Sequence, residues 1–436
     1  IVLTSSGIPW DREEEYAELD QKVNQNLIDP YNTDFNALGL GRFADDIDII
    51  ISGGVSKGYN LPWYDPYSHV YIFQNYGNGT GFGHFEMLFD SKTNIFQGYK
   101  SMVDGKVGQT LLDDDFDFDF SELDKIKSYN KRAKKDLYAP LDVNEKSINQ
   151  FTNINQKKVD YNQWNIPSYG KEANLEVMSW NCEFFPAAGD STIKAMSEVI
   201  TDLDIDIIAF QEIKKAAWFE KLMRTLPEYD YVISKNSSFF DQAYIYKKEI
   251  FSFIRDKEPF SDNDYNFAGR PPLRLDLMLE YDNLDIPISL VNLHMKCCDS
   301  GLKRRQKASQ MLFDYLDNEI SETGYSNFIV LGDWNDDLND EPDEHCFNPF
   351  LNGDKFYFLT DRIDDDIRNA TYPKEPYVSF LDHIMTTTSF IEDNLDVEVK
   401  TVMIEDYIGG FEVYEILMSD HRPVMFSIPF SKLPKN

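Results

Sequence analysis

A short apolar run that ends in glycine and two polar residues constrains the fold of this chain most. Phe328 to Leu331 are four apolar residues in a row, which is typical of a strand covered on both faces. Gly332 follows, and glycine lets the chain turn sharply where a strand leaves its sheet. Asp333 and Asn335 come next. Such a pair is usually only a turn, but ligands of α/β folds gather at strand ends, so the rest of the chain must decide.

The same arrangement recurs along the C-terminal half of the chain. Five further apolar runs carry an amide, a carboxylate or a histidine at or near one end: Asn181, Glu212, His294, Asp382 with His383, and Asp420 with His421. A lone histidine in such a run is more often a core residue than a catalytic one. Here three of the six histidines of the chain lie in these runs. The repetition indicates one shared site.

In chain order these runs read WN, QE, NLH, GDWN, LDH and SDHRPV. The series resembles the endonuclease/exonuclease/phosphatase superfamily, which includes deoxyribonuclease I, inositol polyphosphate 5-phosphatases, neutral sphingomyelinases and deadenylases. The resemblance covers about residues 174 to 430. Bacterial extracellular nucleases look most similar, because their histidine strand also continues into Lys-Cys-Cys and a basic helix. The resemblance implies an α/β domain, a two-sheet β-sandwich flanked by helices, with the site at one end.

Phosphodiester hydrolysis explains why a metal is expected. The reaction needs a hard divalent cation, a base for water, and donors for the charge that builds on the phosphoryl oxygens. Mg²⁺ prefers oxygen ligands and keeps several waters, so one or two carboxylates suffice. The resemblance makes Glu212 the principal ligand, with Asn181 beside it and Asp420 as a further ligand. Mg²⁺ is the expected cofactor, with Mn²⁺ or Ca²⁺ as alternatives.

The same resemblance implies the catalytic side chains. Asp333 and Asn335 match the pair that orients the attacking water and contacts the phosphate. His421 matches the general base or stabiliser of phosphate charge, and Asp382 the carboxylate that fixes its tautomer. His294 matches the second histidine, which donates to the scissile phosphate or the leaving oxygen. Whether Asp333 or His421 takes the proton of water differs between family members and stays open.

Four other side chains are candidate substrate contacts. Arg270 precedes a strand where nuclease members often carry a basic residue, although an arginine in solvent is equally expected. Gln242 and Tyr244 lie on a strand where relatives place phosphate-contacting side chains, but alternation alone makes Tyr244 as good a core aromatic. Arg304 belongs to a basic run that opens a helix and favours a phosphate-backbone contact. His383 should face away from the site, because strand neighbours point to opposite faces.

The net charge of −34 limits what the chain binds. Most of this acidity lies in residues 174 to 436. Nucleic-acid binding usually rests on a basic surface that releases counterions, so an acidic body repels the polyanion at long range. A metal site with a local basic rim still engages one phosphate, and salt screens the remainder. The sequence therefore predicts weak, sequence-independent binding of nucleic acid, DNA rather than RNA.

Three functions from different classes remain. The first is a Mg²⁺-dependent phosphodiesterase, a low-specificity DNA endonuclease that uses water activated by an Asp/His pair. The second is an inositol-phosphate or sphingomyelin phosphohydrolase of the same superfamily, which the acidity favours. Against it, Leu381-Asp382-His383 replaces the Pro-Ala-Trp-Cys-Asp-Arg motif of inositol 5-phosphatases, and no membrane-inserting hairpin is apparent. The third is a structural, surface or virion protein with a nuclease-like domain, but every expected catalytic position is filled.

Length and pattern predict two domains in the 436 residues. Residues 1–125 carry strand-like runs between glycine-rich turns, which predicts a small β-rich accessory domain whose partner is unknown. Residues 126–173 are rich in Asn, Lys, Gln and Tyr, as in a linker. Residues 174–436 form the predicted catalytic domain. No apolar run is long enough to cross a membrane.

The cysteines and the first residue bear on location. Cys182, Cys297, Cys298 and Cys346 show no CxxC spacing, so a structural zinc is not expected. Adjacent cysteines bridge each other only with strain, so a disulfide would join one of Cys297 and Cys298 to a distant partner. A chain that begins with Ile1 fits removal of a signal or pro-segment, or a trimmed sequence. With the acidic surface, this favours an extracellular or cell-surface protein.

Overall fold

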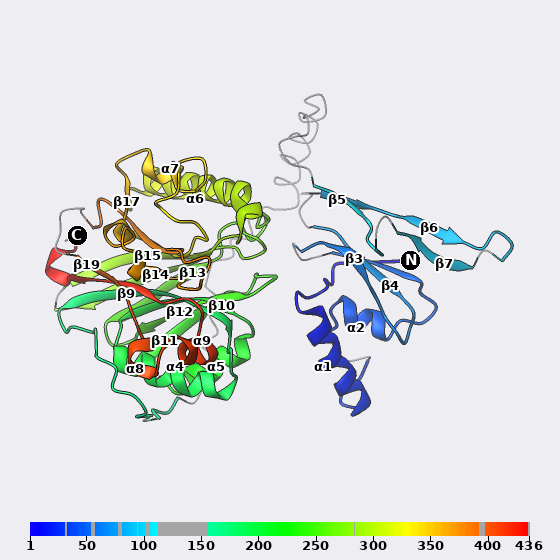
Figure 1. Cartoon of the computed structure of the whole chain (residues 1–436), viewed down its shortest axis with the longest axis horizontal. Coiled ribbons are helices and arrows are strands. Elements are labelled where there is room, and N and C mark those ends of the chain that lie inside the picture. Colours follow the sequence, from blue (N-terminus) through cyan, green and yellow to red (C-terminus); the bar gives the residue numbers. More distant parts are fainter. Residues whose placement is uncertain are drawn as a thin grey trace. The chain divides into compact units, whose positions relative to one another are not determined.

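The computed structural model of the chain describes most of its residues, namely 1–30, 33–53, 57–76, 81–93, 95–101, 104–111, 156–159, 161–282, 284–391 and 397–434. The chain divides into two compact units, Ile1–Ile148 and Asn149–Asn436 (Figure 1). None of the described helices is long and apolar enough to cross a membrane.

The first unit is rich in strands, as predicted. Its main sheet has the order β1-β2-β4-β3, with β3 antiparallel to β4 and the other neighbours parallel. Among the described residues of this unit, two helices and two two-stranded sheets accompany it, and Ile50, Val70 and Ile72 lie in its core. The elements are β1 (Val2–Thr4), α1 (Arg12–Asn24), α2 (Ala37–Arg42), β2 (Ile49–Ser52), β3 (Tyr59–Tyr64), β4 (Tyr71–Gln74), β5 (Gly81–His84), β6 (Glu86–Phe89), β7 (Phe96–Lys100) and β8 (Gly108–Leu111).

The described residues of the second unit form two sheets of six strands each. The first has the order β11-β12-β10-β9-β20-β19 and the second β13-β14-β15-β16-β18-β17. The strands are β9 (Asn174–Phe185), β10 (Ile207–Ile213), β11 (Tyr229–Ile233), β12 (Asp241–Lys247), β13 (Phe251–Lys257), β14 (Leu273–Tyr281), β15 (Leu284–His294), β16 (Phe328–Asp333), β17 (Phe356–Phe358), β18 (Asp382–Thr387), β19 (Glu398–Thr401) and β20 (Val424–Pro429).

Helices cover the outer faces of both sheets (Figure 1). The helices are α4 (Asp190–Leu203), α5 (Ala216–Met223), α6 (Leu302–Thr323), α7 (Asn348–Leu351), α8 (Glu405–Ile408) and α9 (Phe411–Leu417), with 3-10 segments at Asp299–Gly301, Leu359–Arg362, Ile367–Asn369 and Phe430–Lys432. Helices α4, α5, α8 and α9 lie on the outer side of the first sheet, whereas α6 and α7 cover the second. This is the helix-flanked β-sandwich that the sequence predicts.

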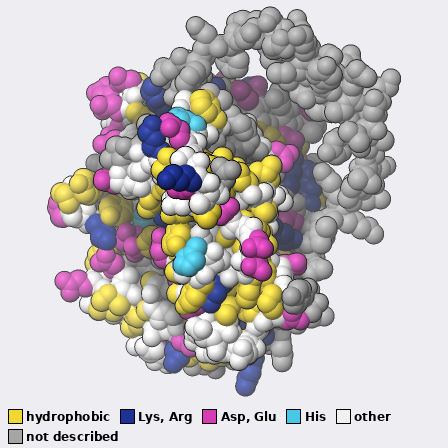
Figure 2. All heavy atoms as spheres, turned by 90° about the vertical axis from the view of Figure 1, so that its right-hand side faces the viewer, with side chains coloured by type: hydrophobic (Ala, Val, Ile, Leu, Met, Phe, Trp, Pro, Cys, Tyr) yellow, Lys and Arg dark blue, Asp and Glu magenta, His cyan; other side chains and the backbone are white. Residues whose placement is uncertain are grey.

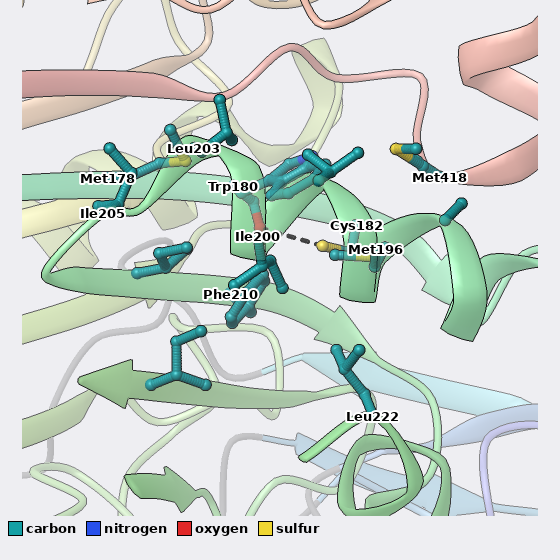
Figure 3. Packing of buried hydrophobic residues seen from close by; sticks show 14 of the residues in the cluster. Met178, Trp180, Cys182, Met196, Ile200, Leu203, Ile205, Phe210, Leu222 and Met418 are labelled. Atoms are coloured by element: carbon teal, nitrogen blue, oxygen red, sulfur yellow. Dashed lines mark hydrogen bonds between the residues drawn. The ribbon is translucent and has the colours of Figure 1, made fainter. Parts of the chain in front are cut away.

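Alternation along the strands explains the layers. Val177 and Ile207 of the first sheet and Leu275 and Leu290 of the second share one buried cluster, which fills the space between the sheets. Their neighbours on the strands point outward to a second cluster, shown in Figure 3, where Trp180 and Phe210 pack against α4. Successive side chains of a strand point to opposite faces, so an apolar strand supplies two cores at once.

The predicted linker, residues 126–173, falls only partly within the described residues. From Gln156 onward it follows the surface of the second unit. The Nε2 atom of Gln156 donates to the carbonyl oxygens of Met223, Leu226 and Tyr229 at 2.9–3.1 Å. Residues 126–155 lie outside the described residues. The described end of this segment therefore belongs structurally to the second unit.

Candidate active site

Three neighbouring strands of the second sheet place ionisable side chains side by side. Strands β15 and β16 run parallel with His294 opposite Asp333, and β16 and β18 run antiparallel with Asp333 opposite Asp382. Adjacent strands lie about 4.8 Å apart, so the three side chains share one edge of the sheet. All three are buried.

Gly332 permits this close register. Its φ is +143°, and a Cβ atom at this position would lie 2.0 Å from the carbonyl oxygen of Leu293 on β15. No side chain fits there without displacing the backbone. Gly332 therefore lies within β16 rather than in a turn, and its missing side chain lets β16 approach β15 just before Asp333.

The first group of the site joins both sheets. Asn181 is a buried residue in the C-terminal half of β9, and Glu212 lies near the end of β10. The Nδ2 atom of Asn181 donates to Asp333 Oδ2 at 2.9 Å and to Glu212 Oε1 at 3.2 Å. His294 Nε2 lies 3.4 Å from Asp333 Oδ2 and 3.6 Å from Glu212 Oε1. The ligating atoms of Glu212, His294 and Asp333 lie within 4.8 Å of one another, which is compact enough for one metal ion.

The side chain of Asn181 faces the two carboxylates with its amide nitrogen. Its amide nitrogen bridges the two carboxylates, while its Oδ1 accepts the backbone N–H of Glu183 at 3.0 Å. An amide binds a cation through its oxygen. In this arrangement Asn181 therefore orients Glu212 and Asp333 rather than acting as a ligand itself.

The second group is a buried Asp-His pair that shares Asp333 with the first. His421 Nδ1 lies 2.7 Å from Asp382 Oδ2, and the ligating atoms of Asp333, Asp382 and His421 lie within 4.8 Å of one another. The backbone N–H of His421 donates to Ser419 Oγ at 2.9 Å, and Ser419 Oγ donates to Asn181 O at 2.6 Å. These bonds tie the SDH segment to β9.

Burial and charge shift the pKa values of the group. Burial raises the pKa of Asp333 to about 7, with a further contribution from the charge of Asp382. Burial lowers the pKa of His421, but the charge and hydrogen bond of Asp382 outweigh it and raise the pKa to about 10. Burial, together with the positive charges of Arg270 and His421, holds the pKa of His294 well below its usual range. At neutral pH His421 is charged and His294 is neutral.

Asn335 supports the carboxylate beside it. Its φ is +53°, a left-handed conformation that asparagine tolerates better than most residues. The conformation turns its backbone N–H toward Asp333 Oδ1 at 2.8 Å, and its Nδ2 donates to the carbonyl oxygen of Met295 at 3.2 Å. Asn335 therefore fixes the orientation of Asp333.

Asp420 lies on the His421 side of the site. Its Oδ1 is 3.9 Å from His421 Nε2, and its Oδ2 is 3.7 Å from Nζ of Lys374. Among the described residues, it belongs to neither candidate metal group. A lysine and a histidine thus face its carboxylate, and the role of Asp420 as a further metal ligand stays a prediction.

Two of the four predicted substrate contacts, Gln242 and Tyr244, are buried between the sheets. Tyr244 is fully buried and donates to Leu273 O at 3.2 Å, which makes it a core aromatic and corrects its prediction as a phosphate contact. Gln242 is also fully buried, and its Oε1 accepts the N–H of Leu273 at 3.3 Å, so the same correction applies. In both cases the strand turns the side chain inward, where no substrate reaches it.

The two arginines are held by backbone carbonyls. Arg270 is buried and donates to His294 O at 3.1 Å and Met295 O at 2.6 Å. The alternative of an arginine in solvent is therefore wrong, since this side chain supports the loop behind His294, and its contact with substrate stays a prediction. The guanidinium of Arg304 lies 4.1 Å from the ring centre of Tyr265 and donates to the Tyr265 carbonyl, and its contact with a phosphate stays a prediction.

His383 faces away from the site. Its Nδ1 lies 3.0 Å from Thr360 Oγ1, and its Nε2 lies 3.1 Å from Asp336 O. The neighbouring Asp382 points to the opposite side and reaches His421. The two-residue period of β18 thus separates a core histidine from a site carboxylate.

Sequence reasoning missed an exposed phenylalanine beside Glu212. Phe184 is 50% exposed, although it follows a buried strand segment, and its backbone N–H donates to Glu212 Oε2 at 3.1 Å. Its φ of +52° turns the chain outward. The ring packs against Phe240, which in turn contacts Phe239. The adjacent phenylalanines before Pro186 are the only sequence signal for this feature.

Comparisons with known proteins place these residues in context. The model described as Endonuclease/Exonuclease/phosphatase family matches residues 178–421. No curated protein matches the chain. Solved structures that resemble it include TDP2 of D. rerio humanized by 14 mutations, with 14% identity over 59% of this chain and 99% of that chain at a TM-score of 0.44. A mannosyl-6-phosphatase of Bacteroides thetaiotaomicron has 16% identity over 58% and 99% at 0.42. The human Nocturnin catalytic domain has 16% identity over 58% and 94% at 0.42.

Proposed function

Because the chain belongs to the endonuclease/exonuclease/phosphatase family, whose members hydrolyse phosphoester bonds, we propose that its second unit is a divalent-metal-dependent phosphodiesterase acting on nucleic acid. One observation supports this most strongly. Asp333 belongs both to the group with Glu212 and His294 and to the group with Asp382 and His421. Because this carboxylate lies between a candidate metal site and a charged histidine, the groups that orient water and those that neutralise phosphate charge lie close together.

The donors present fit a hard divalent cation. The carboxylates of Glu212 and Asp333 lie close enough to be bridged by one amide, and Asp333 is buried beside a further carboxylate, which raises its pKa. Oxygen donors with uncompensated negative charge are what Mg²⁺ or Mn²⁺ prefers. Glu212 would hold the ion, with Asn181 orienting its carboxylate, and Asp333 would lie beside the ion and stay free to act on water. When bound, the ion would supply Lewis-acid neutralisation of the phosphate and acidify a bound water.

The chain's own residues divide the proton chemistry. Asp333 has a pKa of about 7, which suits a general base at neutral pH, and we assign it the proton of the attacking water. His421 is charged, and its Nε2–H is left to donate to a phosphate oxygen because Nδ1 is held by Asp382. His294 is neutral and contributes a hydrogen bond rather than charge. We therefore propose Asp333, rather than His421, as the group that takes the proton of water.

An exposed aromatic beside Glu212 favours nucleic acid as the substrate. Phe184 presents half of its surface to solvent and is backed by Phe240. A nucleobase stacks on such a ring with little regard to its sequence, and this contact does not depend on surface charge. It therefore suits an acidic protein that binds its substrate weakly. DNA is our first choice, with RNA as an outcome of the test.

The charge favours a second candidate, hydrolysis of a small phosphoester such as an inositol phosphate. The chain has a net charge of −34, and acidic side chains are scattered over the face seen in Figure 2 among lysines, arginines and apolar groups. A small substrate has fewer phosphates for an acidic surface to repel. Phe184 has no evident role in that reaction.

A side-by-side assay separates the two functions. Purified full-length protein would be given supercoiled plasmid, a single-stranded oligodeoxynucleotide, the matching RNA and an inositol polyphosphate, each with Mg²⁺ or Mn²⁺. We expect cleavage of the nucleic acids, with DNA preferred, and no phosphate release from the inositol polyphosphate. Phosphate release without strand cleavage would replace the proposed function by the second candidate.

A further inference from the structure

Two adjacent cysteines lie just beyond His294 and have no part in the proposed reaction. The Sγ atoms of Cys297 and Cys298 are 3.0 Å apart, and both residues are exposed. Cys182 and Cys346, the other cysteines of the chain, are buried, and all four are free thiols. Neither Cys297 nor Cys298 forms a disulfide with a distant cysteine. Accessible thiol chemistry is confined to the adjacent pair.

The surroundings of the pair favour reactivity. The Nζ atom of Lys296 lies 3.2 Å from Cys297 Sγ. Burial opposes ionisation of Cys297, but hydrogen bonds from Cys298 and Lys296, with the Lys296 charge, outweigh it and lower the pKa of Cys297. The thiolate is the nucleophile in thiol–disulfide exchange, so Cys297 is the attacking sulfur and Cys298 is placed to resolve its product.

The backbone that carries the pair also holds the site. The carbonyl oxygen of Met295 accepts from Arg270 Nη2 at 2.6 Å and from Asn335 Nδ2 at 3.2 Å. The carbonyl oxygen of Cys298 accepts from Arg305 Nη1 at 2.7 Å. Asn335 in turn fixes Asp333 through its backbone N–H. A change of backbone conformation at the cysteines thus acts on residues that orient the proposed base.

We propose that Cys297 and Cys298 form a reactive dithiol that exchanges with low-molecular-weight disulfides, and that the resulting vicinal disulfide lowers phosphoester hydrolysis. The Cys297 thiolate attacks one sulfur of the small disulfide and releases one thiolate. Cys298 then loses its proton to solvent and attacks Cys297 Sγ, which releases the second. Two electrons pass to the small disulfide, which leaves as two thiols. A disulfide between neighbours is strained, so thiols reverse it readily.

The test is thiol mass analysis with a parallel activity assay. Reduced full-length protein is incubated with oxidised glutathione, analysed by intact and peptide mass spectrometry, and assayed on plasmid before and after dithiothreitol. We expect loss of two hydrogen atoms within the Cys297–Cys298 peptide, no retained glutathione, and a severalfold fall in hydrolysis that dithiothreitol reverses. Cys298→Ser should trap one glutathione on Cys297. The variant with both cysteines replaced by serine should keep its activity and lose the response.

The outcomes separate the parts of the proposal. No mass change, or two retained glutathiones in the parent protein, overturns the dithiol. A vicinal disulfide that leaves hydrolysis unchanged overturns its coupling to the site. The activity arm rests on the proposed function, but the mass arm does not. If the reduced protein hydrolyses no phosphodiester, the proposed function fails while the mass result still decides the thiol chemistry.

Discussion

His421 Nδ1 lies 2.7 Å from Asp382 Oδ2, which joins the segment before β20 to the first residue of β18. The two residues are 39 positions apart in the chain, and His421 lies outside the strands, in the segment that leads into β20 of the other sheet. The contact leaves Nε2 of His421 as the nitrogen available to a substrate and raises the histidine pKa to about 10. The electrostatics of the proposed mechanism depend on this one bond.

Asp382→Asn should lower activity about 100-fold or more, which is the usual contribution of general acid–base catalysis to the rate. The variant removes the charge that keeps His421 protonated. Since the charged form is the active one, activity is lost as pH rises through the His421 pKa, and this loss should begin at lower pH in the variant. The pH profile of kcat/KM measures it, with Asp262→Asn, an exposed aspartate, as the matched control. An unshifted alkaline limb would contradict the role of His421.

Phe184→Ala should weaken binding of a single-stranded oligonucleotide by about tenfold to a hundredfold, the usual worth of one stacked base. Hydrolysis of a small phosphodiester without a base should change little, because the variant leaves Glu212 in place. Fluorescence anisotropy with a metal that does not support turnover measures the affinity. Phe82→Ala, at a similarly exposed phenylalanine of the first unit, is the control. Equal affinities for the two variants would remove Phe184 from the substrate site.

Gly332→Ala should destabilise the second unit by at least about 2–3 kcal/mol, because the new Cβ meets the Leu293 carbonyl and the φ of +143° is unsuited to alanine. Gly353→Ala is the matched control, since its Cβ would meet nothing within 4 Å. Urea denaturation compares the two midpoints. A Gly332→Ala protein as stable as the Gly353→Ala protein would show that β15 and β16 are not held in this register.

A buried glutamate between β9 and β20 makes stability depend on pH. Burial and the neighbouring Asp206 raise the pKa of Glu176 to about 7, against hydrogen bonds from Ser427 and Lys171 that lower it. The folded state binds this proton more tightly than the unfolded chain. Stability from Glu176 is therefore present below its ordinary pKa of 4.5 and declines as pH rises toward 7.

Glu176→Gln should flatten this decline and stabilise the protein above pH 7 by roughly 1–3 kcal/mol, because a neutral side chain of the same shape remains. Unfolding free energies at a series of pH values measure the effect. Glu172→Gln, at an exposed position four residues earlier in the chain, should leave the curve unchanged. If the Glu176→Gln and Glu172→Gln variants showed the same dependence of unfolding free energy on pH, Glu176 would ionise as easily in the folded state as in the unfolded chain.

Much of the fold and of the site follows from local pattern. The apolar runs that end in Asn181, Glu212, His294 and Asp333 are strands. Parallel pairing brings Asn181 beside Glu212 in one sheet and His294 beside Asp333 in the other. The period of two also separates His383 from Asp382. These features depend on residues close in sequence, which is why the sequence predicts them.

The remaining features depend on long-range contacts. Tyr244 and Gln242 are buried because a second sheet covers them, and alternation cannot tell a covered face from a substrate face. Arg270 is buried because the loop after His294 offers carbonyl oxygens. Phe184 is exposed because its backbone adopts a left-handed conformation. This conformation is uncommon for phenylalanine, so the residue type does not predict it. The residues next to these four in the sequence therefore do not predict whether their side chains are buried or exposed.

Plasmid nicking by matched variants tests the metal-phosphoester site most directly. Parent protein and Glu172→Gln should nick supercoiled DNA with Mg²⁺ or Mn²⁺ and stop when EDTA is added. Glu212→Gln and His421→Ala should lose about 100-fold or more of this activity, while circular dichroism shows that both variants are folded at the assay temperature. Nicking that resists EDTA, or that survives in both Glu212→Gln and His421→Ala, would contradict the account.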